Sequence, residues 1–149
     1  MKNILVVILF SILTNRASYC QTSRNDISVG KNLLSDTSKI VTPLALVQKQ
    51  VIGYNARNLN AFLEPYSEDV EIYLFPDKLI SKGKENMQKT YREMFLSFPE
   101  LHCDIKERLI QGNIIIDKEI ISGMGNTKIE STTIFQIQNN KIAKVYFIE

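Results

Sequence analysis

The sequence has few of the residues that build disulfide scaffolds, metal centres or nucleic-acid surfaces. It contains two cysteines and one histidine among 149 residues. Two cysteines cannot form a disulfide framework, and the spacing typical of metal ligands is absent, so we expect no metal site. Beyond residue 20, 16 basic residues balance 16 acidic ones, whereas a nucleic-acid surface needs clustered positive charge. No glycine-rich dinucleotide or phosphate loop occurs, and we expect no cofactor and no nucleic-acid partner.

The remaining composition is that of one ordinary globular domain. Apolar residues make up 44% of the chain and charged residues 23%, which predicts a single hydrophobic core. We divide the chain into a signal peptide (1–20), a polar linker (21–42) and a folded domain (43–149).

The first twenty residues are typical of a secretory leader. Lys2 precedes an apolar run of about ten residues, which is too short to span a bilayer but fits the core of a signal peptide. Ser18 and Cys20 are small residues at the positions expected before a cut at Gln21. The sequence therefore predicts a secreted or periplasmic protein that leaves the membrane once the leader is removed. A lipoprotein with acylated Cys20 is the alternative, although Tyr19 is bulkier than its recognition sequence prefers.

The folded domain begins with two predicted helices. Thr42 and Pro43 favour a helix start, because the Thr hydroxyl can accept a backbone N–H and Pro at the first helical position loses no hydrogen bond. Asn58 can cap a second, short helix that ends before Pro65, and Tyr66 follows in a turn. An apolar stripe at steps of three and four predicts the buried face of the first helix: Leu44, Val47, Val51 and Tyr54.

A strand, a third helix and four more strands follow. Alternation from Val70 predicts a strand that stops at Pro76. After Gly83 a helix is predicted up to Pro99, with a Met and aromatic stripe: Met87, Tyr91, Met94, Phe95 and Phe98. The last fifty residues predict an antiparallel meander over 101–110, 113–123, 128–138 and 141–148, with Gly and Asn at the turns. The fold class is therefore α+β, with a curved antiparallel sheet wrapped around the N-terminal helices.

The order of elements and several motifs make the domain similar to the SnoaL-like group of the nuclear transport factor 2-like superfamily, the fold shared with ketosteroid isomerase. The resemblance covers residues 43–149. It rests on the segments 54–63 and 66–73, the 83–99 helix, the segments 112–113 and 116–119, and Asn140-Lys141-Ile142 opening the last strand. It implies a cone-shaped fold with an apolar pocket, a small-molecule ligand that is steroid- or polyketide-like, and a homodimer formed through the sheet.

The resemblance does not carry ketosteroid isomerase chemistry onto this chain. Matching that enzyme's pattern places its catalytic base near Leu74 and its two oxyanion donors at Gln50 and near Thr133. None of the three is the acidic or tyrosine residue that the reaction uses. We therefore expect no isomerase activity on steroids.

The resemblance implies a carboxylate in the pocket, and the candidates are Glu107, Asp117, Glu119 and Glu130. Of these, Glu119 is the candidate catalytic residue. Its strand phase places Asp117 and Glu119 on one face together with Ile115 and Ile121. An acid among apolar neighbours is either paired or has a raised pKa that suits acid/base chemistry. The alternative is that this face is the outer, dimer-facing side of the sheet, where the carboxylates meet Lys118 or Arg108.

His102, the single histidine, is a second and weaker catalytic candidate. Regular alternation puts it on a charged, solvated face with Asp104, Lys106 and Arg108, while Cys103 points the other way as a buried, inert thiol. A bulge that turned His102 inward would pair it with Glu119.

Seven aromatic residues are predicted to line the pocket: Tyr54, Phe62, Tyr73, Phe75, Tyr91, Phe95 and Tyr146. Aromatic rings with hydroxyl tips suit a small, flat, partly polar molecule. We predict binding of such a ligand, with or without isomerase-, cyclase- or dehydratase-like acid/base chemistry. The alternative is a non-catalytic dimerisation or interaction module whose interior is merely core.

Overall fold

The computed structural model describes residues 41–148 of the chain. The predicted signal peptide, the cut before Gln21, the alternative at Cys20 and nearly all of the predicted linker lie outside the described residues. None of the helices within 41–148 is both long enough and apolar enough to cross a bilayer.

Both predicted helix starts are confirmed by their caps. Helix α2 (Pro43–Asn55) begins at Thr42, whose Oγ1 accepts the Ala45 N–H at 3.1 Å. Helix α3 (Leu59–Leu63) begins at Asn58, whose Oδ1 accepts the Ala61 N–H at 3.1 Å. These bonds satisfy N–H groups that the first turn of a helix cannot pair internally.

Helices α2 and α3 cross at Gly53, where their backbones are too close together for any side chain at that position. A Cβ atom on Gly53 would lie 2.4 Å from the backbone nitrogen of Phe62, so only glycine fits at this crossing. On the buried stripe of α2, Val47, Val51 and Tyr54 are at most 8% exposed. Leu44 is 40% exposed, because it lies in the first turn of the helix, and this corrects its assignment to the stripe.

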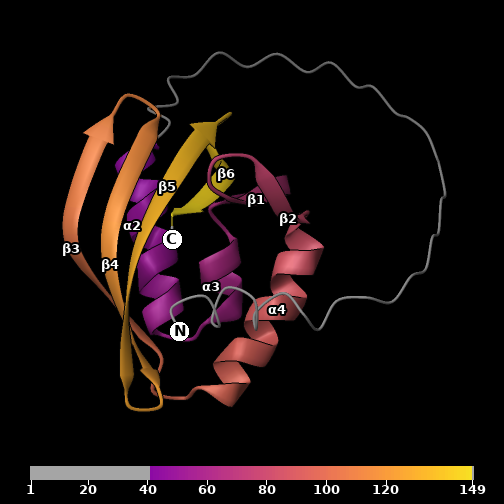
Figure 1. Cartoon of the computed structure of the whole chain (residues 1–149). Helices are drawn as coiled ribbons and strands as arrows, with labels where there is room; N and C mark the ends of the chain where they lie inside the picture. Colours follow the sequence, from indigo (N-terminus) through magenta and orange to yellow (C-terminus); the bar gives the residue numbers. More distant parts are fainter. Residues whose placement is uncertain (1–40, 149) are drawn as a thin grey trace, which may run out of the picture.

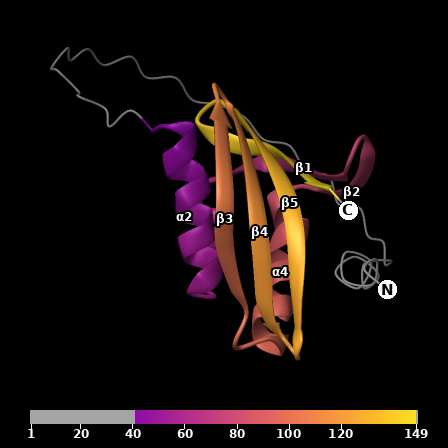
Figure 2. The ribbon, with the colours of Figure 1, turned by 60° about the vertical axis from the view of Figure 1, so that its left-hand side comes forward.

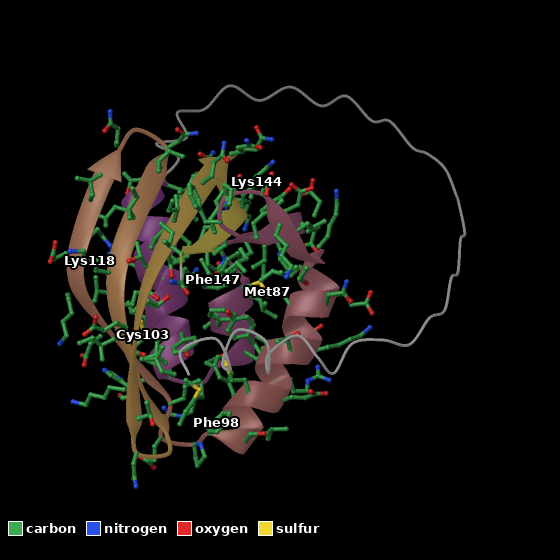
Figure 3. The ribbon with its side chains drawn as sticks, viewed as in Figure 1. Met87, Phe98, Cys103, Lys118, Lys144 and Phe147 are labelled. Atoms are coloured by element: carbon green, nitrogen blue, oxygen red, sulfur yellow. The ribbon has the colours of Figure 1, made fainter. Side chains whose placement is uncertain are left out.

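The third predicted helix is α4 (Lys84–Ser97), which buries Met87, Met94 and Phe95. It packs against α3 and against the first two strands. Figure 3 shows Met87 and Phe147 between the helices and the sheet, whereas Lys118 projects from the opposite side of the sheet.

Six strands form one curved, open sheet around the helices (Figure 1). Their order is β2-β1-β6-β5-β4-β3. Their bounds are β1 (Tyr66–Leu74), β2 (Lys78–Lys82), β3 (His102–Gln111), β4 (Ile114–Met124), β5 (Thr127–Gln138) and β6 (Lys141–Ile148). The α+β class with helices on a curved sheet is confirmed. The four predicted C-terminal strands agree with β3–β6 to within one residue at every end.

The sheet is mixed rather than wholly antiparallel. Strand β6 pairs antiparallel with β5 but parallel with β1, where Ile72 lies opposite Val145. Strand β6 therefore joins the β2–β1 hairpin to the β3–β4–β5 meander. The predicted antiparallel sheet is wrong on this one pairing, because the partner of β1 lies about seventy residues away and leaves no local signal in the sequence.

The N-terminal part of the sheet is larger than the sequence pattern predicts. Strand β1 begins at Tyr66, which is 2% exposed, rather than in a turn that ends at Val70. Strand β2 (Lys78–Lys82) was not expected, since its five residues are largely exposed and show no alternation.

Alternate residues of the sheet face the helices and solvent. The inner face carries Ile72, Ile115, Phe135 and Val145, each at most 3% exposed. Helix α2 covers β3, β4 and β6 on this face, and Figure 2 shows α2 beside and α4 behind the strands. The outer face is left uncovered by the described helices.

Candidate active site

Strand β4 directs two acidic side chains into the interior. Ile115, Asp117 and Glu119 alternate onto the inner face and are 0%, 0% and 7% exposed. The face that carries them is therefore the helix-facing side and not the outer side of the sheet. Two carboxyl groups in a hydrophobic core each need a partner, or a raised pKa, to be tolerated.

Glu119 has a partner on one side only. Thr133 of β5 donates a hydrogen bond from its Oγ1 to Oε2 of Glu119 at 3.1 Å. No residue within 41–148 hydrogen-bonds the other oxygen, Oε1. In that part of the chain, Ser67 Oγ is the single side-chain polar atom that is both fully enclosed and without a partner. Glu119 Oε1 is therefore not fully enclosed, although Glu119 as a whole is only 7% exposed.

The surroundings of Glu119 raise its pKa into the physiological pH range. Burial raises the pKa of Glu119 from its ordinary value of 4.5 to about 7, and the negative charge of Asp117 adds to this rise. The hydrogen bond from Thr133 and the positive charge of Arg108 act in the opposite direction. A carboxyl group with such a pKa can both give and take a proton at neutral pH.

Asp117 is held in a buried ion pair with Arg108. The guanidinium donates from Nε to Oδ1 and from Nη2 to Oδ2, both at 2.6 Å. Its Nη1 also donates to Oε1 of Gln48 on α2 at 3.0 Å. The hydrogen bonds to Asp117 raise the pKa of Arg108 above its ordinary value. The fork geometry of two parallel bonds is the strong form of an Arg–carboxylate contact.

The position of Arg108 corrects the predicted face of β3. The register of β3 against β4 shifts between Ile105 and Glu107, so that Lys106 is an extra residue in a β-bulge. Regular alternation would place Arg108 outside and Leu109 inside. The bulge reverses this, since Arg108 contacts Asp117 and Leu109 is 57% exposed.

The same bulge does not turn His102 inward. Its side chain is 50% exposed, and Nε2 lies 3.4 Å from Oδ1 of Asp104, also on the surface. His102 pairs in register with Ser122, away from Glu119. The structure therefore does not assemble the His102–Glu119 pair. Cys103 is buried, and burial raises the pKa of its thiol well above the ordinary range.

The predicted pocket residues fall into two groups. Four form one interior cluster, with ring centroids 4.3–6.3 Å apart: Tyr54, Phe62, Tyr91 and Phe95. Burial raises the pKa of Tyr54 and of Tyr91, and the charge of Glu119 contributes to both rises. Glu119 and the phenol rings therefore share one interior region.

The other three predicted pocket residues lie elsewhere. Tyr73 and Tyr146 stack on each other with centroids 5.0 Å apart. They alternate with the buried Ile72 and Val145 and so face the outer side of the sheet. Phe75 follows β1 and is 53% exposed. These three positions are corrected: each is one residue out of phase with the inner face.

Tyr66 joins the interior cluster, although the sequence pattern placed it in a turn. Its ring centroid lies 5.4 Å from that of Phe62. Its hydroxyl donates to Oε1 of the buried Gln50 at 3.3 Å. Burial raises its pKa above the ordinary value, and Glu119 again contributes. Tyr66 stands between Pro65 and three polar residues (67–69), so no local pattern marked it as buried.

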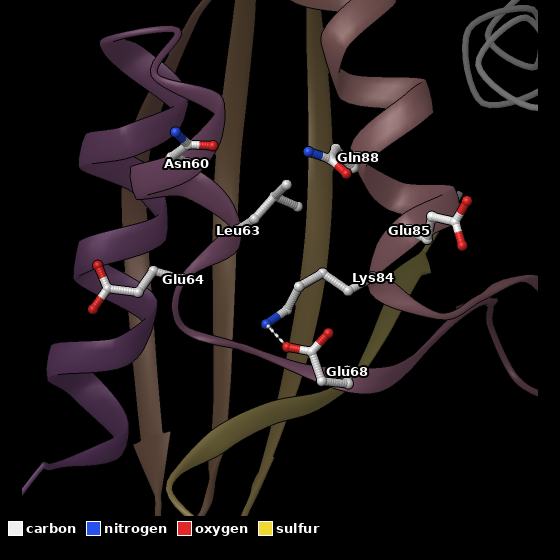
Figure 4. A pocket seen from close by; sticks show the side chains of 7 residues that line it. All are labelled: Asn60, Leu63, Glu64, Glu68, Lys84, Glu85 and Gln88. Atoms are coloured by element: carbon white, nitrogen blue, oxygen red, sulfur yellow. Dashed lines mark hydrogen bonds and ion pairs between the residues drawn. The ribbon is translucent and has the colours of Figure 1, made fainter. Parts of the chain in front are cut away.

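Two surface hollows lie away from Glu119. The larger, of about 370 Å³, lies between α3, the start of β1 and α4 (Figure 4) and is lined by Asn60, Leu63, Glu64, Glu68, Lys84, Glu85 and Gln88. Lys84 and Glu68 close part of it with an ion pair of 2.6 Å. The smaller, of about 170 Å³, borders β1 and β6. Neither contains a predicted pocket residue, and residues 41–148 contain no group of three or more potential metal ligands.

Solved structures with the same architecture share little sequence with this chain. A nuclear transport factor 2-like protein of unknown function from Cytophaga hutchinsonii aligns with TM-score 0.63 at 14% identity, over 74% of this chain and 92% of its own. A proposed ketosteroid isomerase from Kribbella flavida gives 0.62 at 16% identity, over 71% and 76%. A proposed polyketide cyclase from Sinorhizobium meliloti gives 0.59 at 14%, over 68% and 92%. Likeness at this identity shows the fold alone.

A family model gives the assignment that structural likeness cannot. No curated protein matches the sequence. The model of the SnoaL-like domain matches residues 47–145, which include every described helix and strand at least in part. Because the family model matches residues 47–145, the chain belongs to the SnoaL-like domain family.

Proposed function

We propose that this SnoaL-like domain binds a small, flat organic molecule between the sheet and the helices and exchanges a proton with it through Glu119. The observation that carries the proposal is that Oε1 of the buried Glu119 carboxyl group has no hydrogen-bond partner among residues 41–148, whereas Oε2 is bonded by Thr133. A structural carboxyl group is expected to have both oxygens paired, as Asp117 does.

The surroundings of Glu119 favour an aromatic or polycyclic ligand. The charge of Glu119 reaches Tyr54 and Tyr91, both of which pack edge-on against Phe95. Aromatic rings of this kind bind flat apolar bodies. The structural neighbours named as a ketosteroid isomerase and a polyketide cyclase make steroid- or polyketide-like molecules the first candidates.

The chemistry available to Glu119 is acid/base catalysis without a cofactor. With a pKa of about 7, its carboxylate can take a proton from a carbon or hydroxyl group and its acid form can return one. The steroid isomerase reaction itself is not expected, because Leu74, Gln50 and Thr133 occupy the places of its base and oxyanion donors. Strong turnover of a β,γ-unsaturated steroid ketone would contradict this.

The test compares what the full chain and its Glu119→Gln variant retain on purification, by unbiased mass spectrometry of small molecules. The amide keeps the volume and the Thr133 contact but cannot carry a proton. We expect a retained molecule whose amount falls at least tenfold in the variant, and any turnover to fall about 10²- to 10⁴-fold. Glu130→Gln is the matched control, since Glu130 is exposed on the adjacent strand β5. Equal retention and turnover in all three proteins would refute the proposal.

A second candidate function is self-association through the outer face of the sheet. One continuous row of apolar residues crosses all six strands in register: Leu79, Tyr73, Tyr146, Ile134, Ile116 and Leu109. Its ends are open, with Leu79 49% and Leu109 57% exposed. An apolar row of this length on a monomer is typical of an interface.

We expect light scattering to give a homodimer at tens of micromolar, and Ile134→Lys to convert it to monomer. Lys128→Gln, at the exposed start of β5, is the control that should leave the dimer intact. A monomer in the parent protein would count against this candidate function.

We also propose that the chain is exported and that the mature protein begins at Gln21. The leader pattern of residues 1–20 supports this. N-terminal sequencing of the exported protein tests it, and an intact leader or a lipid-modified Cys20 would contradict it.

A further inference from the structure

The bulge in β3 brings a positive charge into the interior beside Glu119. Ile105 lies opposite Glu119 and Glu107 opposite Lys118, so Lys106 has no partner of its own. Beyond the bulge, Arg108 lies opposite Asp117 on the inner face. Regular alternation would leave Arg108 in solvent. The bulge instead places its guanidinium inside, opposite Asp117, which is two residues before Glu119 on β4.

The Arg108–Asp117 ion pair has a bidentate, buried geometry. Both carboxylate oxygens are bonded at 2.6 Å, Asp117 is 0% exposed and the Arg108 side chain is 14% exposed. The bond from Arg108 to Gln48 ties the pair to α2. Three elements thus fix its position relative to Glu119, which follows Asp117 on the same face of β4.

Six titratable groups face Glu119 from the elements packed around it: Asp117, Arg108, Cys103, Tyr54, Tyr66 and Tyr91. The thiol and the three phenols have pKa values raised above their ordinary values by burial, so they are neutral where Glu119 titrates. The charged neighbours that remain among the described residues are Asp117 and Arg108.

We propose that the buried Arg108–Asp117 ion pair positions two opposite charges that set how readily Glu119 gains and loses its proton. The inference deepens the proposed function and rests on it for its biological meaning. The negative charge of Asp117 disfavours a charged Glu119, and the positive charge of Arg108 favours it. In the intact pair the two charges oppose each other at Glu119, with Asp117 the stronger, whereas removal of either member leaves the other acting alone.

The test measures the titration midpoint of Glu119 in the full chain without any ligand. Carbon-13 NMR of the glutamate carboxyl groups follows it, and the Glu119 signal is identified by its loss in Glu119→Gln. We expect Asp117→Asn to lower the midpoint by about one pH unit or more, and Arg108→Gln to raise it by a similar amount. The double variant should return to within about half a unit of the parent.

The control removes a charge from the same two strands on the other face. Glu107 and Lys118 form an exposed ion pair at 3.1 Å, and Glu107→Gln should leave the midpoint of Glu119 unchanged. A merely structural ion pair would give no opposite-signed shifts. If the two single variants shift Glu119 in the same direction, or by less than about 0.3 units, the proposal is overturned.

Arg108→Gln leaves Asp117 without its partner and is the variant at risk of not folding. In that case Asp117→Asn and the double variant decide. A Glu119 midpoint that is lowered in Asp117→Asn and restored in the double variant supports the proposal. A midpoint that Asp117→Asn leaves unaltered refutes it. The titration is independent of ligand retention. Opposite shifts with no retained molecule would sink the proposed function alone, and retention with no shifts would sink this inference alone.

Discussion

The burial of Glu119 makes the stability of the domain depend on pH in the direction opposite to most acidic residues. Its pKa is about 7 in the folded protein, against an ordinary value of 4.5. The folded state therefore binds this proton more tightly than the unfolded state. The resulting stabilisation is complete below about pH 4.5 and is lost as the pH rises through about 7.

We predict that Glu119→Gln removes this loss. A shift of this size corresponds to about 3 kcal/mol of unfolding free energy between pH 4.5 and pH 9. Urea unfolding of the parent and the variant at several pH values measures it. The variant should become the more stable protein above pH 7, while Glu130→Gln should follow the parent at every pH. A difference between parent and Glu119→Gln that does not change with pH would contradict the prediction.

At this scale the sequence pattern found the acid but not its surroundings. The two-residue period of β4 was enough to place Glu119 beside Asp117. The partner Arg108 was assigned to the opposite face, because a bulge adds a residue without any composition signal of its own. A fully buried Asp117 requires a cation within reach, and that requirement could have identified Arg108 before the structure did.

At the scale of elements, the crossing of α2 and α3 depends on one missing side chain. Gly53→Ala would add a Cβ atom 2.4 Å from the Phe62 nitrogen and 2.6 Å from its Cα. Backbone atoms cannot rotate away as a side chain can, so the two helices must separate.

We predict a net loss of about 2 kcal/mol for Gly53→Ala, since overpacking of about 3 kcal/mol exceeds the gain in helix propensity of about 1 kcal/mol. Urea unfolding checks the value. Ile52→Ala is the neighbouring control, because Ile52 is 60% exposed and its truncation should change stability by less than about 0.5 kcal/mol. A Gly53→Ala protein as stable as the parent would contradict the prediction and show that α2 and α3 can separate at little cost.

The elements that the sequence predicted well are those whose signals are local. Caps at Thr42 and Asn58 and the turn residues of the meander are read from a few neighbouring residues. Strand β2 (Lys78–Lys82) has no such signal, because an exposed edge strand needs neither alternation nor apolar residues. Phe75 was extrapolated from the period of β1 into the turn that ends it.

For the molecule as a whole, β6 is the seam between two halves of the sheet. Ile142 and Val145 are 0% and 3% exposed. Val145 lies opposite Ile72 of β1 on one side and opposite Phe135 of β5 on the other. We predict that Ile142→Ala costs about 2–5 kcal/mol. Ile148→Ala, at a position 37% exposed at the end of the same strand, should cost much less. Thermal or urea unfolding compares them, and equal losses would contradict the central role of β6.

The placement of β6 also dictates an order of events during protein synthesis. The β3–β4–β5 meander and the β1–β2 hairpin pair only near neighbours, whereas the second edge of β1 must wait for residues 141–148. Until β6 pairs with them, β1 and β5 each present one unpaired edge. Chains in which β6 has not yet paired are therefore the most open to misassociation, and a chaperone that recognises strand edges would act on them.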